Sequence, residues 1–248
     1  MNIKIKNEFA SVQKVAVICL FCLYAGVLIA QETGKTTWDF PVRYGTKEWE
    51  TLKTVEEQFN AYNIPDNIIK EISTEELVKI CLSYPEWGLM FAYNDKRTGV
   101  YVLIGLFNGF RELLNRNDAV MELLKVYEKL DPLSVDPNWT ALQKGRYGFQ
   151  FTKIEMFLCF PIVSKLDKKD IQKLKEAVVV KYQKKRMLPA MYSLWDLSPT
   201  VGICLNIIET ENAELIRSRT DLKMFKHTLR SNDIHFLDSI VELLKKVE

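Results

Sequence analysis

The feature that most constrains the fold is the recurrence of apolar residues at helical spacing between residues that start and stop helices. The clearest start is Ser73-Thr74-Glu75-Glu76, which has the composition of a capping box. Leu77, Ile80 and Cys81 then follow at the spacing of one helix face, and Pro85 predicts a stop just before it. This pattern, repeated along the chain, predicts an all-α protein.

The same signals place the other helices. Starts are predicted near Thr46, Pro65, Asn117, Asp136-Pro137, Asp167, Ser198-Pro199 and Ser231. A single helix is predicted from about Val100 through Leu114, and its apolar first half favours a central, buried position. No Asn-Gly turn separates alternating strands. We expect an irregular stack of antiparallel helices over 46–248, either a HEAT-like solenoid or a multi-helix bundle.

The first thirty residues have the order of a secretory signal peptide. A basic leader with Lys4, Lys6 and Lys14 precedes an uncharged apolar run from Val15 to Ala30. The run is shorter than the roughly 20 residues of a membrane-spanning helix, which favours cleavage near Ala30/Gln31 over an uncleaved anchor. Residues 31–45 then predict an extended arm, which Trp38, Phe40 and Tyr44 can pin to the helical body. The expected location is the periplasm or the surface of the cell envelope.

The charge balance argues against nucleic-acid binding. The full chain has 34 Lys and Arg against 32 Asp and Glu. Residues 1–30 hold three Lys and one Glu, so the remainder carries equal numbers of basic and acidic residues. A nucleic-acid partner requires a cationic surface that offsets the phosphate charge.

The cysteines left after cleavage are odd in number. Cys81, Cys159 and Cys204 each lie in an apolar helical stripe, which favours three buried thiols over one disulfide with a spare cysteine. Their wide spacing predicts no zinc site.

The strongest local charge asymmetry lies at 165–186. Nine basic and three acidic residues occur in this segment, which could face an acidic protein, an acidic glycan or anionic lipid, or could be an ordinary solvated face. Membrane contact would be peripheral after cleavage. The candidate interaction face consists of Lys168, Lys169, Lys173, Lys184, Lys185 and Arg186.

Two Trp-Asp pairs are candidates for sugar recognition. Trp38-Asp39 and Trp195-Asp196 each place an aromatic plane beside an acid, as glycoside chemistry with two carboxylates requires. The simpler interpretation is that both Trp residues pack and both Asp residues cap turns. The two histidines, His227 and His235, lack zinc-ligand spacing, and we find neither a nucleophile elbow nor a phosphate-binding loop. We therefore assign no catalytic residue, cofactor or metal.

Short blocks of the chain resemble a family of secreted helical proteins of Bacteroidota. The blocks run from Thr37-Trp38-Asp39-Phe40-Pro41-Val42 and Gly45-Thr46-Lys47-Glu48-Trp49 through Ile64-Pro65, Ser73-Thr74-Glu75-Glu76-Leu77, Cys81-Leu82, Phe107-Asn108-Gly109-Phe110-Arg111-Glu112-Leu113 and Ile154-Glu155-Met156. The resemblance spans about residues 37–180. It implies export across a bacterial inner membrane and implies no particular activity.

These observations favour a non-enzymatic module that binds a protein partner, because stacked helices present extended surfaces. The alternative is an envelope glycan or peptidoglycan hydrolase that uses paired carboxylates.

Overall fold

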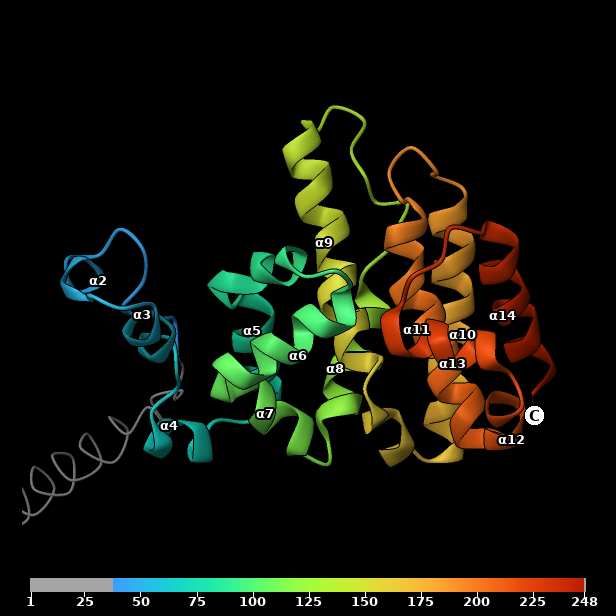
Figure 1. The fold of residues 1–248 in the computed structure, drawn as a ribbon, viewed down its shortest axis with the longest axis horizontal. Helices are drawn as coiled ribbons and strands as arrows, with labels where there is room; N and C mark the ends of the chain where they lie inside the picture. Colours follow the sequence, from blue (N-terminus) through green and yellow to red (C-terminus); the bar gives the residue numbers. More distant parts are fainter. Residues whose placement is uncertain (1–37, 248) are drawn as a thin grey trace, which may run out of the picture. The chain divides into compact units, whose positions relative to one another are not determined.

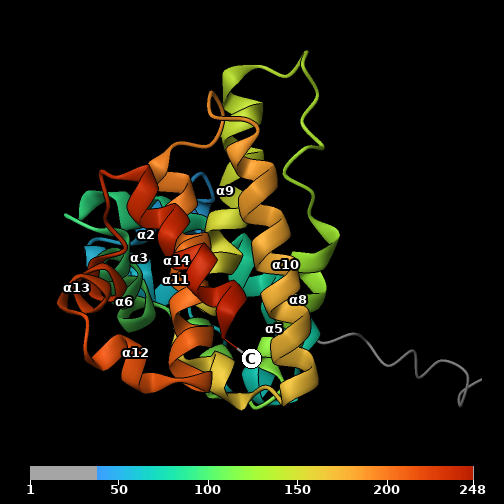
Figure 2. The same cartoon turned by 90° about the vertical axis from the view of Figure 1, so that its right-hand side faces the viewer.

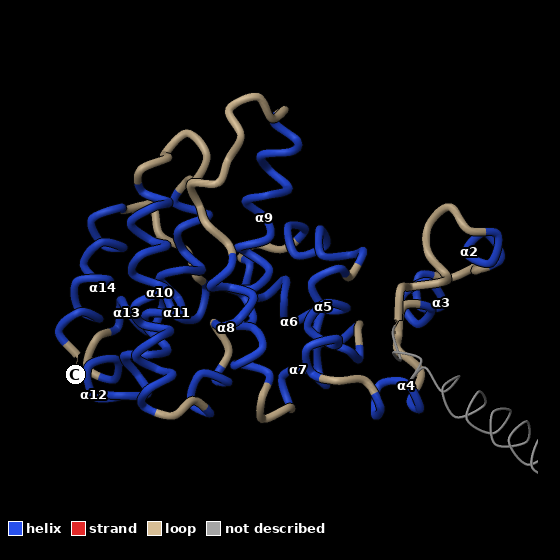
Figure 3. The backbone as a smooth tube through the Cα atoms, turned by 180° about the vertical axis from the view of Figure 1, so that it is seen from behind, coloured by secondary structure: helices blue, strands red, loops and turns tan. Residues whose placement is uncertain are grey.

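The computed structural model describes residues 38–247, and residues Thr37–Glu248 form one compact unit. The described residues contain helices and loops and no strand, which confirms the all-α prediction (Figure 3). None of the described helices is long and apolar enough to span a bilayer. The predicted signal peptide and residues 31–37 of the arm lie outside the described residues.

Most of the helices follow one another with short connections, and a longer loop over residues 130–140 leads from α8 to α9 (Figure 1). In chain order they are α2 (Lys47–Thr51), α3 (Val55–Ala61), α4 (Asp66–Glu71), α5 (Thr74–Ser83), the 3-10 helix η1 (Pro85–Ala92), α6 (Lys96–Leu106), α7 (Asn108–Asn115), α8 (Ala119–Lys129), α9 (Ala141–Leu158), the 3-10 helix η2 (Pro161–Lys165), α10 (Lys168–Arg186), α11 (Leu194–Glu211), α12 (Ala213–Arg217), α13 (Thr220–Thr228) and α14 (Ile234–Lys246).

Helix α11 is the centre of the C-terminal half. Every residue from Leu197 to Ile208 is buried, and the helix packs against α9, α10, α12, α13 and α14. One helix with this many neighbours is typical of a bundle, since a solenoid repeat contacts only the repeats beside it. The predicted buried position of residues 100–107 holds only in part, because Val100 and Leu103 are buried whereas Tyr101 of α6 is exposed.

Capping signals account for most of the confirmed starts. Ser73 Oγ accepts a hydrogen bond from Glu76 N at 3.1 Å, and Asp167 Oδ1 accepts one from Asp170 N at 2.8 Å. Thr46 caps α2, and α5 ends before Pro85 as predicted. Each cap satisfies a backbone N–H that the first helical turn leaves without a partner.

Two predicted helices are each broken in two. Thr54 forms a capping box with Glu57, so the helix predicted to begin near Thr46 divides into α2 and α3. Phe107 is extended (φ −119°, ψ 119°), which separates α6 from α7. The break is stabilised by Asn108, whose backbone N donates to Asn63 Oδ1 at 2.9 Å and whose side chain pairs with both backbone groups of Ile64.

Two predicted start positions were wrong for a shared reason, since a proline was taken as a first-turn residue. Asp136-Pro137 lies in a turn, and α9 begins at Ala141 after a capping box made by Thr140 and Gln143. Pro199 lies inside α11, which starts at Leu194 after Ser193. Helices α12 and α13 were not predicted at all.

The arm is attached to the body by two of its three aromatic residues. Residues Trp38–Gly45 contain no helix, and Trp38 Nε1 donates to Tyr62 O at 3.1 Å. Phe40 is buried, with its ring centroid 6.0 Å from that of Tyr62. Tyr44 is exposed, so it does not pin the arm.

Candidate functional site

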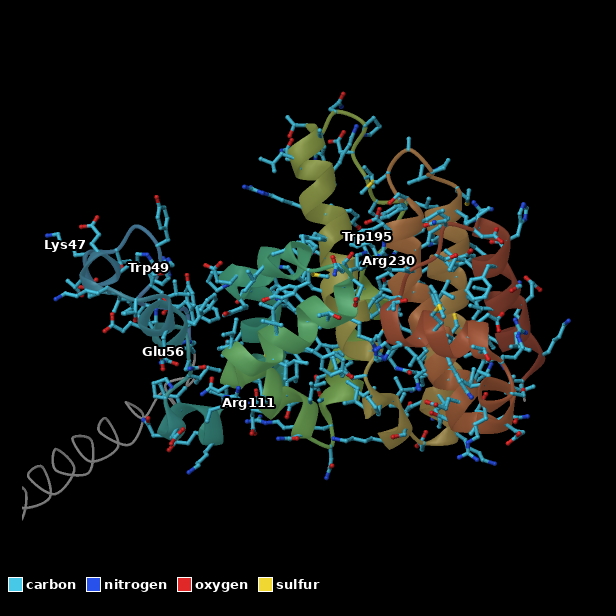
Figure 4. All side chains as sticks on the ribbon, in the orientation of Figure 1. Lys47, Trp49, Glu56, Arg111, Trp195 and Arg230 are labelled. Carbon is cyan, nitrogen blue, oxygen red and sulfur yellow. The ribbon has the colours of Figure 1, made fainter. Side chains whose placement is uncertain are left out.

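One cleft is lined by large apolar side chains that are exposed to solvent, although such side chains are usually buried in a folded protein. It has a volume of about 1070 Å³ and is lined by η1, the first turn of α6, the loop before α9, the first half of α9, the loop after α10 and the first turn of α11. Both loops and the first turns of α9 lie at the same end of the helices (Figures 1 and 2). In Figure 4, Trp195 is labelled between α9 and the start of α11.

The exposed apolar residues of the described chain concentrate in this cleft. Of the ten large apolar side chains with the greatest exposure, five line it. These five are Phe91, Leu133, Leu142, Met187 and Trp195. Met187 is 67% exposed and Leu142 is 65% exposed. Contiguous exposed apolar surface is typical of a binding site, because water contact with it is unfavourable until a ligand covers it.

Two glycines of α9 keep the cleft open. A Cβ added at Gly145 would meet no atom within 4 Å, and one added at Gly148 would meet only Met191 Cε and Tyr192 Cε1, both at 3.7 Å. Neither residue was predicted to line a cleft. Because glycine has no side chain, Gly145 and Gly148 leave this part of the cleft wall open. Each glycine inside a helix also lowers its stability relative to alanine.

The charged groups that line the cleft are mostly cationic. Lys144 and Arg146 lie on α9, and Lys96 lies at the start of α6. The single lining carboxylate is Asp196, whose Oδ2 accepts hydrogen bonds from Ser193 N at 2.9 Å and Ser193 Oγ at 2.7 Å. Asp196 therefore caps its own helix, and the cleft as a whole favours an anionic group on its ligand.

The two Trp-Asp pairs lie in different cavities. Trp38 and Asp39 line a second cavity of about 490 Å³, to which Glu76 also contributes, and Glu76 pairs with Lys79 at 3.5 Å. Trp195 and Asp196 line the larger cleft. A glycosidase needs its two carboxylates in one site, flanking the scissile bond. Asp196 is the only acid that lines the cleft, so this cleft does not provide such a pair.

The basic residues of α10 do not form one face. Lys168, Lys169 and Lys173 are exposed near the start of the helix, and Lys184 and Arg186 lie at its end. Lys184 pairs with Asp131 at 2.9 Å and Arg186 with Asp238 at 3.3 Å. The two groups are separated by roughly 20 Å along a helix that rises 1.5 Å per residue.

Lys185 cannot belong to an exposed interaction face. It is 1% exposed, and its Nζ donates to both carboxylate oxygens of Glu155 at 2.8 Å. Thr200 Oγ1 and Tyr127 OH donate to Glu155 Oε1, each at 2.8 Å. This buried polar cluster of Tyr127, Glu155, Lys185 and Thr200 joins α8, α9, α10 and α11. Burial and the neighbouring Glu155 carboxylate raise the pKa of Tyr127 well above its usual value, which keeps its hydroxyl a donor.

The cysteines of the described residues, Cys81, Cys159 and Cys204, are buried free thiols. Cys159 Sγ donates to Pro199 O at 3.2 Å, and burial raises the pKa of Cys159 to about 12. Burial likewise raises the pKa of Cys81 and Cys204 above the usual thiol value. Such thiols are poor nucleophiles, since the thiolate is the reactive form. The described residues contain no group of three or more His, Cys, Asp or Glu that could hold a metal ion.

Comparison of the chain with models of known protein families, with curated proteins and with solved structures finds no match.

Proposed function

We propose that this protein is a non-enzymatic binding module that holds an apolar, acid-bearing segment of a partner protein in its cleft. The observation that carries the proposal is the convergence of five exposed large apolar side chains on one cavity. A cavity of about 1070 Å³ is large enough for several side chains of a peptide.

Charge complementarity selects the chemistry of the segment. Lys144, Arg146 and Lys96 outnumber the single lining carboxylate, and Arg146 is exposed on α9 without an ion pair among the described residues. Acidic side chains beside apolar anchors would find opposite charge at this site. The anchors would supply most of the affinity, because a few buried apolar groups dominate most interfaces.

The order of residues 1–35 supports placing this activity outside the cytoplasmic membrane of a bacterium. A basic leader, an uncharged apolar run and a polar stretch favour export. The mass of the chain recovered from an expressing bacterium would test this point, with loss of residues 1–30 as the expected result. Envelope glycan hydrolysis remains a hypothesis that no geometry of the cleft supports.

Selection from a library of random 12-residue peptides, displayed on phage with free C-termini, against the full chain tests the binding function. Enriched peptides are expected to combine Leu, Ile, Phe or Trp with Asp or Glu. Met187→Glu and Leu142→Glu should each weaken their binding at least tenfold, about 1.4 kcal/mol, because a carboxylate would be buried against the apolar anchors and would repel the acidic residues.

Met224→Glu is the matched control. Met224 on α13 is 65% exposed, much like Met187, and does not line the cleft. This variant should bind selected peptides as the wild type does. The proposal would be contradicted if the selected peptides bound Met187→Glu as tightly as they bind the wild type. It would also be contradicted if the selection enriched no peptides.

Filling the open wall provides a second, independent test. Gly145→Leu should lower peptide affinity at least tenfold while raising the free energy of unfolding by about 0.5–1 kcal/mol, because the added side chain enters the cleft without a clash and leucine favours the helix. Gly105→Leu is the control, since a Cβ at Gly105 of α6 also meets no atom within 4 Å and lies outside this cleft. Fluorescence anisotropy and urea denaturation of both variants distinguish cavity filling from a change in stability. A Gly145→Leu variant that binds normally would place the ligand elsewhere.

A further inference from the structure

The lining of the cleft includes an unusual buried amine. Lys96 lines the cleft yet is 1% exposed, and its Nζ donates to the backbone carbonyl of Trp195. That carbonyl is available because Pro199, four residues later in α11, has no N–H to donate to it. Lys96 therefore replaces a missing helical hydrogen bond.

The hydrogen bond to the Trp195 carbonyl uses only one of the N–H donors of the Lys96 amine. A lysine ammonium has three N–H donors, and among the described residues the Trp195 carbonyl is its one hydrogen-bond acceptor. The Nζ also lies 4.7 Å from the centroid of the Trp195 ring. No carboxylate forms an ion pair with it in the described chain, whereas the other fully buried lysine, Lys185, is paired with Glu155. A buried cation without an anion is unfavourable, so an anionic ligand group would be stabilised here.

The charged groups around Lys96 come from three helices. Asp196 of α11 and Glu155 of α9 favour its charged form, and Lys185 of α10 opposes it. Both carboxylates are already held, Asp196 by Ser193 and Glu155 by the buried polar cluster. On the other elements that pack against α6, Glu86 of η1 accepts a hydrogen bond from Tyr62, Lys226 of α13 pairs with Glu209, Glu112 of α7 pairs with Arg116, and Arg111 of α7 donates to Gly105 O. Burial disfavours the charged amine more than the two carboxylates favour it, and the pKa of Lys96 falls to about 7.

We propose that the cleft binds the C-terminus of its partner chain, with Lys96 as the residue that receives the terminal carboxylate and the apolar walls as the site for the last side chains. This inference rests on the proposed peptide-binding function. A chain end fits the geometry because only one end of the ligand must enter. An internal Asp or Glu reaching Lys96 would bring two runs of backbone against apolar walls, where peptide N–H and C=O groups lack partners.

A synthetic peptide array tests the inference against the full chain. Seven-residue peptides with varied apolar residues at the last three positions are made in two forms, with a free C-terminal carboxylate and with a carboxamide. We expect the free-carboxylate form to bind at least tenfold more tightly. Equal binding of the two forms would overturn the C-terminus assignment and leave the peptide-binding function standing, whereas no binding by either form would overturn both.

Laurate, which carries the same carboxylate on an apolar chain, is the competitor. Stronger binding of laurate than of every peptide would identify a fatty acid as the occupant and overturn the assignment.

Variants at Lys96 separate carboxylate binding from a structural role. Lys96→Met alone would leave the Trp195 carbonyl without a donor, so it is combined with Pro199→Ala, which restores the backbone N–H. The Lys96→Met/Pro199→Ala variant should fold and bind both peptide forms equally. Pro199→Ala alone should keep the preference for the carboxylate. Retention of that preference in the double variant would overturn the role of Lys96.

The pH dependence supplies a readout that a structural role would not produce. The carboxylate binds the ammonium form, so wild-type affinity for the free-carboxylate peptide should be constant below pH 7 and fall about tenfold per pH unit above it. Lys96→Arg stays charged and should give a flat profile between pH 6 and 9 while keeping the carboxylate preference. A wild-type profile as flat as that of Lys96→Arg would contradict the proposal.

Discussion

Replacing Glu155 by Leu is expected to lower the free energy of unfolding by about 3–5 kcal/mol, the largest effect of any substitution considered. The carboxylate is 0% exposed and accepts hydrogen bonds from Lys185, Thr200 and Tyr127. Its removal leaves the Lys185 ammonium buried without an opposite charge, and leaves two hydroxyls without their acceptor. Guanidinium denaturation followed by circular dichroism would measure the loss.

The double variant Glu155→Leu/Lys185→Met shows how much of the loss comes from the uncompensated charge. Because an apolar pair of similar volume can replace a buried ion pair at little net cost, the double variant should be more stable than Glu155→Leu alone. The exposed pair Lys125–Glu122 is the control, and Glu122→Gln should change stability by less than about 1 kcal/mol. A Glu155→Leu variant within 1 kcal/mol of the wild type would show that the buried polar cluster contributes little.

Local signals in the sequence were sufficient for the helical class and for many helix boundaries. Ser73 and Asp167 act through hydrogen bonds to residues three positions away, so short-range reasoning finds them. Pro199 shows the limit of such reasoning. Inside α11 it leaves the Trp195 carbonyl without its helical donor, and Lys96, which is distant in sequence, supplies one.

The candidate site was only partly predictable. Trp195 and Asp196 were singled out and do line the cleft, although the structure gives Asp196 a capping role. Lys96 and Gly145 were missed because each has an ordinary local context, a lysine at a helix start and a glycine in a polar stretch. Their importance comes from helices that meet only in the folded chain.

Lys185 was misplaced on an exposed face for the same reason. A cluster of basic residues on a helix is usually solvated, and the sequence does not show which member faces inward. The one available signal was Glu155, a single acid within the apolar run from Ile154 to Phe160. A lone buried carboxylate requires a partner, and a basic residue on a neighbouring helix was the natural candidate.

Gly99→Ala is the second substitution for which we expect a large effect, a loss of about 1–3 kcal/mol in the free energy of unfolding. A Cβ at Gly99 of α6 would lie 2.3 Å from Met90 O and 2.7 Å from Met90 Cα. These are backbone atoms of η1, so no side-chain rotation can relieve the overlap. Urea denaturation would measure the loss against Gly105→Ala on the same helix. Gly105 has no atom within 4 Å of an added Cβ, so that variant should gain about 0.5–1 kcal/mol.

The same overlap should also weaken ligand binding, because η1 and α6 each contribute to the cleft. Phe91 follows Met90 in η1, and Lys96 precedes Gly99 by less than one turn of α6. A shift that separates η1 from α6 would move Phe91 away from the Lys96 amine, which we propose binds the terminal carboxylate of the ligand. Gly99→Ala should therefore bind free-carboxylate peptides more weakly than the wild type under conditions where both are folded, whereas Gly105→Ala should not. Opposite signs of the two stability changes, with a binding defect confined to Gly99→Ala, would show that the close approach of α6 and η1 sets the geometry of the cleft. Equal stability and equal binding of the two variants would show that the helices relax around the methyl group.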